Sequence, residues 1–425
     1  MSSFLFTLWA GGGNVPPQLT LARRLAANGH DVRVLAPAVL RQKVEAAGAI
    51  YEPYHHTPEH DEALAEHSLL RDFDARTPVG ALTASRDRLL VGLAGPVAAD
   101  VGAILEREVV DVVAPDWMLM GALYAAERAG VPAAPLVHSV PSLPVEGMPA
   151  FGFGWMPATG PLGRVRDAIG RQAFERMLAG PILQPLNEVR RRLDLRPLDW
   201  AFAPLFAAAR VLVLTSEAFD YPADFPANVR YVGPQLEDPE WQPSWAPPWP
   251  VDDPRPLVVV GLSTTYQAHE RLLHNVVRAL ADLPVRALVT TGAGIAPPAV
   301  ADNVHVEPFV PHGRVLPHAS VVVTHAGHGT TIAALAHGVP VVCLPIGRDQ
   351  PDIAARVAWH GAGVRLRGAR TPNRIAAAIA RVLGDDAYRR SAERLAAAIA
   401  QETHQQRGVA ALEQLAATAP AKRQA

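Results

Sequence analysis

The sequence predicts an α/β protein made of two domains, each with a parallel β-sheet. The chain opens with an apolar run at 4–8, a glycine-rich turn, a helical pattern and a second strand at 31–35, which is the βαβ arrangement of a parallel sheet. The same alternation restarts at 256–260. With 425 residues, 49% of them hydrophobic and 19% charged, the chain is long enough for two cores.

The pattern divides the chain at a proline-rich stretch. We expect an N-terminal domain over residues 1–234 and a C-terminal domain over 256–385. The intervening segment, 235–255, contains six prolines and three tryptophans, which favours a stiff, extended linker. A helical segment over 386–415 follows, and residues 416–425 are predicted to be a disordered tail.

Polar residues in the first domain follow the ends of predicted strands. Asp116 lies in the loop after the strand at 111–114, and His138 ends the strand at 134–137. Ligands bind at this edge of a parallel sheet. The segment 141–161 is rich in Pro, Gly and aromatic residues and is predicted to be irregular, either as a loop over an apolar acceptor pocket or as a surface Ω-loop.

Four histidines lie among acidic residues in a stretch of weak periodicity: His55, His56, His60 and His67. They could form a metal-binding patch or belong to a solvated, variable loop. We favour the loop, because their spacing does not place them on one shared face.

The stretch 321–350 reads as strand, small-residue turn, helix, strand and polar loop. We expect the helix to begin at Thr330 and Thr331, with the free N–H groups of Gly329, Thr330 and Thr331 facing an anion. His325 adds a donor before the turn. Asp349 and Gln350, after the next strand, offer groups suited to neighbouring hydroxyls. A diphosphate beside a polyhydroxylated ring is a nucleotide sugar, although a glycine-rich turn of this kind can also bind nothing.

Composition narrows the class of protein further. A net charge of −2 and a pI near 6.8 give no electrostatic reason to expect a nucleic-acid partner. The one cysteine, Cys343, lies in an apolar strand, so no disulfide framework forms. We found neither a signal peptide nor an apolar run near the roughly 20 residues of a membrane span. The sequence-based expectation is a cytoplasmic protein, and a homodimer stays open.

The segment from His325 to Leu366 resembles the donor-binding signature of the UDP-glycosyltransferase family, closest to the bacterial branch that glycosylates macrolides and related aglycones. The matching residues are His325, Ala326-Gly327, Gly329-Thr330-Thr331, Gly338-Val339-Pro340, Asp349-Gln350-Pro351, Arg356-Val357 and Gly361-Ala362-Gly363. The resemblance implies the GT-B fold, in which two Rossmann-like, doubly wound domains face a cleft. It also implies that the last helix, which would suit residues 388–400, returns to the first domain.

The resemblance assigns further donor-binding residues. Ser263 and Thr264 correspond to the loop that meets the diphosphate, and the segment with Phe309 and Val310 to the one beside the nucleobase, although Phe309 could equally be a core residue. The full expected donor-binding set is Ser263, Thr264, Phe309, Val310, His325, Gly327, His328, Gly329, Thr330, Thr331, Asp349 and Gln350. The expected partners are a nucleotide sugar as co-substrate and an apolar small molecule. Neither a metal nor a further cofactor is expected.

The chain departs from the family at its expected catalytic base. Members usually carry a histidine in the first loop, oriented by an aspartate, but here Asn14 occupies the histidine position while Asp116 matches the aspartate. An amide is not a useful base. Four interpretations stay open: Asp116 acts directly or through a water, another residue such as His138 or a member of 55–67 is the base, the acceptor needs little deprotonation, or the chain binds donor without turnover.

The sequence therefore predicts a hexosyltransferase-type enzyme. We expect it to be inverting and metal-independent, and to move a sugar from a dTDP- or UDP-sugar to a polyketide, another secondary metabolite or a lipid. The alternative is a nucleotide-sugar-binding pseudoenzyme or accessory protein that lacks the usual histidine. An epimerase of the same architecture is a third reading, which the Asp-Gln-Pro motif disfavours.

Overall fold

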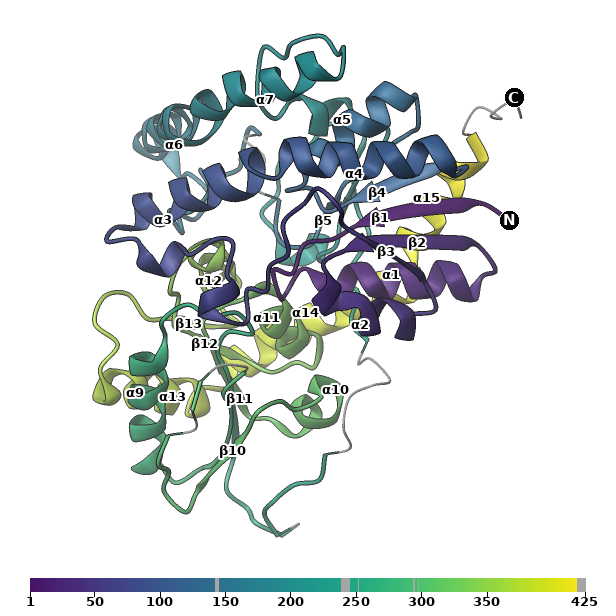
Figure 1. Cartoon of the computed structure of the whole chain (residues 1–425). Helices are drawn as coiled ribbons and strands as arrows, with labels where there is room; N and C mark the ends of the chain where they lie inside the picture. The colour runs from purple at the N-terminus through teal and green to yellow at the C-terminus, as the bar shows by residue number, and fades with distance from the viewer. Residues whose placement is uncertain (142–144, 238–244, 251, 293–294, 297, 419–425) are drawn as a thin grey trace.

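The computed structural model contains two α/β domains packed against each other, the N-terminal one above the C-terminal one in Figure 1. It is described here for all residues except 142–144, 238–244, 251, 293–294, 297 and 419–425. Both domains have parallel sheets covered by helices, as the sequence predicts.

The N-terminal domain contains two parallel sheets joined by single bridges. One has the strand order β3-β2-β1-β4 and the other β5-β6-β7, and parallel bridges such as Asp116 to Leu136 connect β4 to β5. The strands are β1 (Ser3–Thr7), β2 (Asp31–Ala36), β3 (Ile50–Pro53), β4 (Val112–Pro115), β5 (Leu136–Val137), β6 (Val211–Val213) and β7 (Val229–Tyr231). The apolar side chains of the central strands β1 and β4 are almost fully buried because helices cover both faces, whereas Ile50 of the edge strand β3 is exposed.

The C-terminal domain has a six-stranded parallel sheet in the order β10-β9-β8-β11-β12-β13. Its strands are β8 (Leu257–Gly261), β9 (Arg286–Thr290), β10 (Val304–Glu307), β11 (Val321–Thr324), β12 (Val341–Cys343) and β13 (Gly363–Arg365). Numbered within the domain, this is the doubly wound order 3-2-1-4-5-6. Cys343 is free and buried in this sheet, as expected.

The helices follow the predicted alternation. Those of the N-terminal half are α1 (Val15–Ala27), α2 (Arg41–Ala46), α3 (Pro78–Ser85), α4 (Ala94–Arg107), α5 (Met120–Ala129), α6 (Gly160–Phe174), α7 (Gly180–Arg192) and α8 (Ala203–Ala207). Those of the C-terminal half are α9 (Glu270–Ala281), α10 (His312–Val315), α11 (His328–Ala336), α12 (Gln350–Trp359), α13 (Pro372–Leu383), α14 (Asp386–His404) and α15 (Arg407–Thr418).

The sheet of β1 to β4 and the sheet of the C-terminal domain each reverse their strand order at one point, and such points define the edges where ligands bind in parallel sheets. In the first domain the reversal lies between β1 and β4, whose following loops carry Asn14 and Asp116. In the second it lies between β8 and β11, whose following loops carry Ser263 and His325. A crevice opens at such a reversal because neighbouring loops turn to opposite faces of the sheet.

The chain returns to the first domain within the predicted segment 386–415, but mainly through α15 and less through residues 388–400. These residues belong to α14, whose Leu395 and Ile399 pack in the core beside α11. From α15, Val409 and Leu412 enter the core formed by β1, β2 and α1. The predicted tail also begins too early, because α15 continues to Thr418; the tail residues 419–425 lie outside the described part.

The region before α4 is more helical than predicted. Residues 78–107 form one continuous helical stretch, α3 and α4 joined through a π-helical turn at 86–91, although the sequence shows only weak periodicity from His55 to about Ala99. This stretch is long and apolar enough to cross a membrane by composition, but half of the relevant window is buried in the protein. A core helix has these properties too, so the stretch is weak evidence for a span.

The histidine-rich segment is not wholly solvated. His60 is buried, its Nε2 accepts a hydrogen bond from the backbone N–H of Ala10, and its ring stacks near Trp9. His55, His56 and His67 are exposed. Within the described residues, no group of three or more His, Cys, Asp and Glu side chains is arranged to hold a metal ion.

Candidate active site

Asn14 and Asp116 lie in contact at the strand reversal of the first domain. Thr7 at the end of β1 pairs with Pro115 at the end of β4, which brings the two loops side by side. Asn14 is the residue before α1, and Pro16 and Pro17 fix the first turn of that helix. The Asn14 side chain donates through Nδ2 to Asp116 Oδ2 at 2.9 Å.

Asp116 is fully buried, and its carboxylate accepts hydrogen bonds from several donors. Besides Asn14, Gln18 donates through Nε2 to Oδ2 at 2.7 Å, and the backbone N–H of Met118 donates to Oδ1 at 3.0 Å. His138 Nδ1 lies 3.3 Å from Oδ2. This contact is an ion pair when the His138 ring is protonated.

The two ionisable groups of this cluster stabilise each other's charge. Burial alone would raise the pKa of Asp116, but the charge of His138 and the hydrogen bonds from Met118 and Asn14 outweigh it, so the pKa is lowered. Burial would lower the pKa of His138, but the Asp116 carboxylate raises it overall. The His138 side chain keeps 19% of its surface exposed, whereas that of Asp116 has none. Of these two residues, only His138 has surface with which it can contact a ligand.

The predicted donor-binding loop meets this cluster across the cleft. Ser139, next to His138, donates through Oγ to Asp349 Oδ2 at 2.6 Å. Asp349 also contributes to the raised pKa of His138. The residue expected to hold the sugar hydroxyls thus lies beside the candidate base, although their predicted elements are more than 200 residues apart in the sequence.

His328 has a different position from the one expected. Its Nε2 lies 2.7 Å from Thr215 Oγ1, in the loop after β6 of the first domain. Burial, together with the nearby charges of His138 and Arg356, lowers the pKa of His328 to about 3, so the ring is neutral. The side chain joins the two domains and is not free for a donor ligand in this structure.

The turn after β11 requires small residues. A Cβ at Gly327 would lie 2.5 Å from the His325 ring, so only glycine allows the ring to pack there. Burial, followed by the charges of His269 and Arg348, lowers the pKa of His325 to about 3, and the neutral ring can donate one hydrogen bond.

The free backbone N–H groups at the N-terminus of helix α11 lie one residue earlier than predicted. Helix α11 begins at His328 rather than Thr330, and the N–H of Thr331 is already donated to the Gly327 carbonyl. The free N–H groups of this helix N-terminus are therefore those of His328, Gly329 and Thr330. The error arose because the two threonines, and not the preceding Gly327, were taken to mark the start of the helix.

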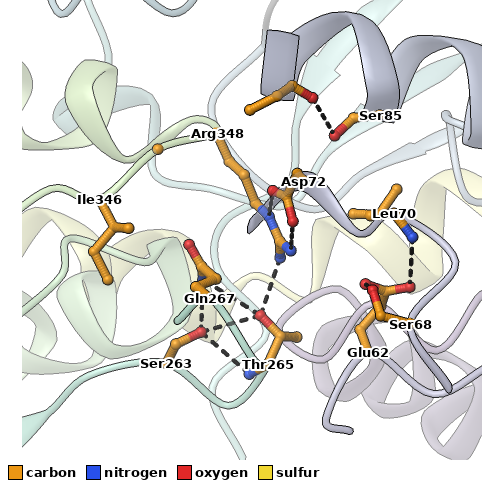
Figure 2. Close-up of polar contacts among 12 residues, drawn as sticks. Glu62, Ser68, Leu70, Asp72, Ser85, Ser263, Thr265, Gln267, Ile346 and Arg348 are labelled. Carbon is orange, nitrogen blue, oxygen red and sulfur yellow. Dashed lines mark hydrogen bonds and ion pairs between the residues drawn. The ribbon is translucent and has the colours of Figure 1, made fainter. Parts of the chain in front are cut away.

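Polar side chains of the loop after β8 are linked to each other and to the loop before α12. Ser263 Oγ lies within hydrogen-bond distance of Thr265 Oγ1 and Gln267 Nε2, at 3.0 and 2.7 Å, as Figure 2 shows. Gln350 donates through Nε2 to Gln267 Oε1 at 2.8 Å, and its own Oε1 accepts the N–H groups of Ile346 and Gly347. Thr264, in contrast, is exposed.

The remaining predicted donor-site residues lie in the loop after β10. Phe309 is 41% exposed, so its ring is not a core residue, and the expectation of base stacking stays a prediction. Val310 is buried in the core of the C-terminal domain. Any contact of Val310 with a nucleobase would therefore be made by its backbone.

The sequence interpretation missed four polar residues of the cleft: Gln18, Ser139, His269 and Arg348. For Gln18 a signal exists, because it follows Asn14 by four residues and so lies on the same face of α1. Ser139 and Arg348 adjoin the predicted residues His138 and Asp349. His269 has no comparable signal, since its place depends on the path of the loop after β8.

Comparison with known proteins agrees with this architecture. Residues 274–415 match the model of the C-terminal domain of erythromycin biosynthesis protein CIII-like proteins. The chain is 33% identical over 397 residues to 4'-demethylrebeccamycin synthase of Lentzea aerocolonigenes, covering 91% of this chain and 92% of the relative. A rhamnosyltransferase of PGL/p-HBAD biosynthesis from Mycobacterium bovis is 35% identical over 225 residues, which are 51% of this chain and 48% of that protein.

Solved structures share the whole fold. The glycosyltransferase of kitacinnamycin superposes with a TM-score of 0.75 at 21% identity, covering 97% of this chain and 98% of that one. The glycosyltransferase VinC, solved in complex with dTDP, superposes with a TM-score of 0.67 at 20% identity over 98% and 99% of the two chains. Given this fold, the donor-binding signature and the full-length similarity, the chain belongs to the macrolide-type family of GT-B glycosyltransferases and is a glycosyltransferase.

Proposed function

We propose that this glycosyltransferase moves a sugar from a dTDP- or UDP-sugar to an apolar small molecule, with inversion at C1, without a metal, and with His138 as the base. The observation that carries this proposal is the hydrogen bond from Ser139 to Asp349. It places His138, paired with Asp116, beside the carboxylate expected to hold the sugar.

The reaction follows from that placement. An acceptor N–H or O–H next to His138 Nε2 gives its proton to the ring while the acceptor atom bonds to C1 of the sugar. The bond from C1 to the diphosphate oxygen breaks, and its electron pair leaves with the diphosphate. Attack on the face opposite the leaving group inverts C1. Asp116 faces Nδ1, so it orients the ring and stabilises the charge that His138 gains.

His138 fits the role of base better than Asp116. The Asp116 side chain has no exposed surface, and three side chains already contact its Oδ2. Its lowered pKa also makes it a weaker base. His138 has a raised pKa and an accessible edge, as a general base at neutral pH requires.

The loop predicted to cover the acceptor favours an apolar, aromatic acceptor molecule. Residues 145–159 form no helix or strand, and within them Phe153 and Trp155 stack with ring centroids 4.5 Å apart. This loop touches the beginning of α12, close to Asp349. The relatives named 4'-demethylrebeccamycin synthase and PGL/p-HBAD biosynthesis rhamnosyltransferase support a secondary metabolite or a lipid as acceptor here.

The proposal is tested by measuring release of UDP or dTDP from the corresponding sugars in the presence of phenolic, indole, polyketide and lipid acceptors. Release that depends on one acceptor class, with the opposite anomeric configuration in the product and no loss of rate in EDTA, is expected. A product with retained configuration, or a rate abolished by EDTA, would contradict the corresponding part of the proposal.

The same assay separates the alternatives. Binding of a nucleotide sugar without turnover over the whole panel would indicate a donor-binding pseudoenzyme. Release of nucleotide that does not depend on an acceptor, accompanied by a changed sugar, would indicate an epimerase.

A further inference from the structure

A half-buried arginine, Arg348, and a buried histidine, His269, next to the donor loop have no role in the mechanism so far. The role inferred for them concerns the nucleoside diphosphate that leaves in the transfer reaction, so this inference rests on the proposed function. When the bond between C1 and oxygen breaks, the departing nucleoside diphosphate keeps the electron pair and gains one negative charge. In a site that excludes water, fixed positive or hydrogen-bonding groups stabilise that charge most effectively.

Arg348 lies at the junction of the two domains, directly before Asp349. Its backbone φ of 57° is unusual for a residue other than glycine, so the loop holds it in a costly conformation. Its guanidinium donates through Nη1 to Thr265 Oγ1 at 3.0 Å and through Nε and Nη2 to the carboxylate of Asp72, at 2.7 and 2.9 Å. Figure 2 shows this fork between Asp72 and the network of Thr265 and Ser263.

His269 is an unsatisfied buried group at the end of the same loop. It is 3% exposed, and neither of its ring nitrogens has a hydrogen-bond partner. Burial lowers its pKa below the ordinary value of a histidine. A buried ring of this kind destabilises the protein unless a ligand bonds to it.

The two residues border the same loop, the one after β8. Arg348 donates to Thr265 of this loop, and His269 stands at its end, directly before α9. Both also lie within electrostatic range of His325, since each contributes to the lowering of its pKa. Ser263 and the open N terminus of α11 adjoin the same strand reversal. An anion there would meet the guanidinium, the two imidazole rings and the free N–H groups together.

We propose that Arg348 and His269 bind the diphosphate of the nucleotide, and that Arg348 stabilises the charge this diphosphate gains as the sugar leaves. Donor binding then transfers part of the Arg348 interaction from Asp72 to phosphate oxygens. The competing reading is that Arg348 only holds the domains together through Asp72.

The test is calorimetric binding of UDP, dTDP, uridine and thymidine to the full-length protein. We expect Arg348→Met and His269→Asn each to weaken binding of the preferred diphosphate by about tenfold or more, with nucleoside binding unchanged. Arg348→Lys should recover part of the lost affinity, because it restores the charge without the fork. His274→Asn, an exposed histidine of α9, is the matched control and should bind like wild type.

Asp72→Asn separates phosphate binding from domain docking. If Arg348 binds phosphate, this variant binds the diphosphate as well as wild type or better, because Arg348 loses a competing partner. Equal losses in Arg348→Met and Asp72→Asn would show a docking role only and overturn the assignment of Arg348, and wild-type binding by His269→Asn would overturn that of His269. If wild type itself bound neither diphosphate, the proposed function would fail.

Discussion

In the proposed mechanism His138 is the base, and Asn14 and Asp116 support it. In this chain the residue of the first loop cannot accept a proton, and it instead donates to Asp116. Its orientation is fixed, because Nδ2 also donates to the Trp9 carbonyl at 3.0 Å. The Asn14 Oδ1 atom is buried without a partner. An acceptor N–H or O–H is the kind of group that would satisfy it.

Replacing Asp116 by Asn should change both the rate and its pH dependence. In the wild type, kcat/KM should fall as the pH drops through the pKa of His138, which the carboxylate raises above the ordinary value of about 6.5. Without the carboxylate, burial dominates and lowers that pKa, so this acidic limb should move to lower pH. The rate at neutral pH should fall by about 10²–10⁴-fold.

A profile of kcat/KM from acidic to alkaline pH measures this effect, with dTDP and UDP affinities as the control for folding. An acidic limb that stayed in place in Asp116→Asn would show that the pair with His138 does not set it.

The sequence predicted part of this cluster for a physical reason. Asp116 and His138 follow strand ends, and strand ends of a parallel sheet share one edge. The sequence could not choose between the two as base, because that choice depends on burial: Asp116 has no exposed side-chain surface, while His138 has some. Ser139 was not predicted as a site residue because its partner, Asp349, belongs to the other domain.

Helix α12 connects the donor loop to the acceptor loop. Its Asp352 accepts hydrogen bonds from the N–H groups of Gly152 and Gly154, at 2.6 and 2.8 Å. Arg365 of β13 also donates to the Gly154 carbonyl. Gly154 has a φ of 61°, and a Cβ there would lie 2.7 Å from the Pro351 carbonyl oxygen, so glycine is needed for this contact. The loop of the first domain is thus held by the second.

Replacing Asp352 by Asn should weaken acceptor binding more than donor binding. Burial raises the pKa of Asp352 to about 6, yet at neutral pH the carboxylate still accepts from both glycines, whereas an amide has a single acceptor oxygen. We expect the acceptor KM to rise by about tenfold, corresponding to roughly 1.4 kcal/mol.

Steady-state kinetics with both substrates varied measures this change. Asp282→Asn, an exposed residue after α9, is the control. An unchanged acceptor KM, or an equal change in donor affinity, would show that the contact does not position the acceptor loop.

The helical stretch at 78–107 shows why a helix can be missed when only its sequence is known. Its first part, α3, has no buried residue and therefore no clear apolar stripe. A helix recognised by amphipathic spacing is missed where one face does not pack on a core.

The two domains are joined by a buried ion pair as well as by the cleft contacts. Arg356 of α12 lies 2.7 Å from Asp220 of the first domain, and their side chains are 3% and 1% exposed. Arg356 also lies over the Tyr221 ring, 4.2 Å from its centroid. Helix α15 adds an apolar contact, where Gly408 approaches Leu21.

Asp220→Ala should destabilise the whole molecule, because it leaves the Arg356 charge buried without its partner. We expect a loss of about 3–5 kcal/mol in the free energy of unfolding. Urea denaturation measures it, with Glu45→Ala as the control, since the pair of Arg41 and Glu45 is exposed and should contribute little to the free energy of unfolding. A loss below about 1 kcal/mol for Asp220→Ala would contradict this role of the pair.

At the scale of the molecule, the parallel sheets of both domains were predictable because many of their strands are apolar runs, such as Val321 to Val323 of β11. The domain on which α14 and α15 each pack was not predictable. Both helices are Ala-rich and amphipathic, and the sequence does not say which sheet each one covers. Contacts between the domains, such as Arg356 with Asp220, depend on how the finished domains meet.

The most direct test of the central claim is the transfer rate of His138→Gln at saturating donor, measured together with its affinity for UDP and dTDP. If His138 removes the acceptor proton, the rate falls by about 10²–10⁴-fold while the nucleotide affinity stays at the wild-type value. A variant that transfers sugar at the wild-type rate would contradict the account and return the base to another group in the cleft.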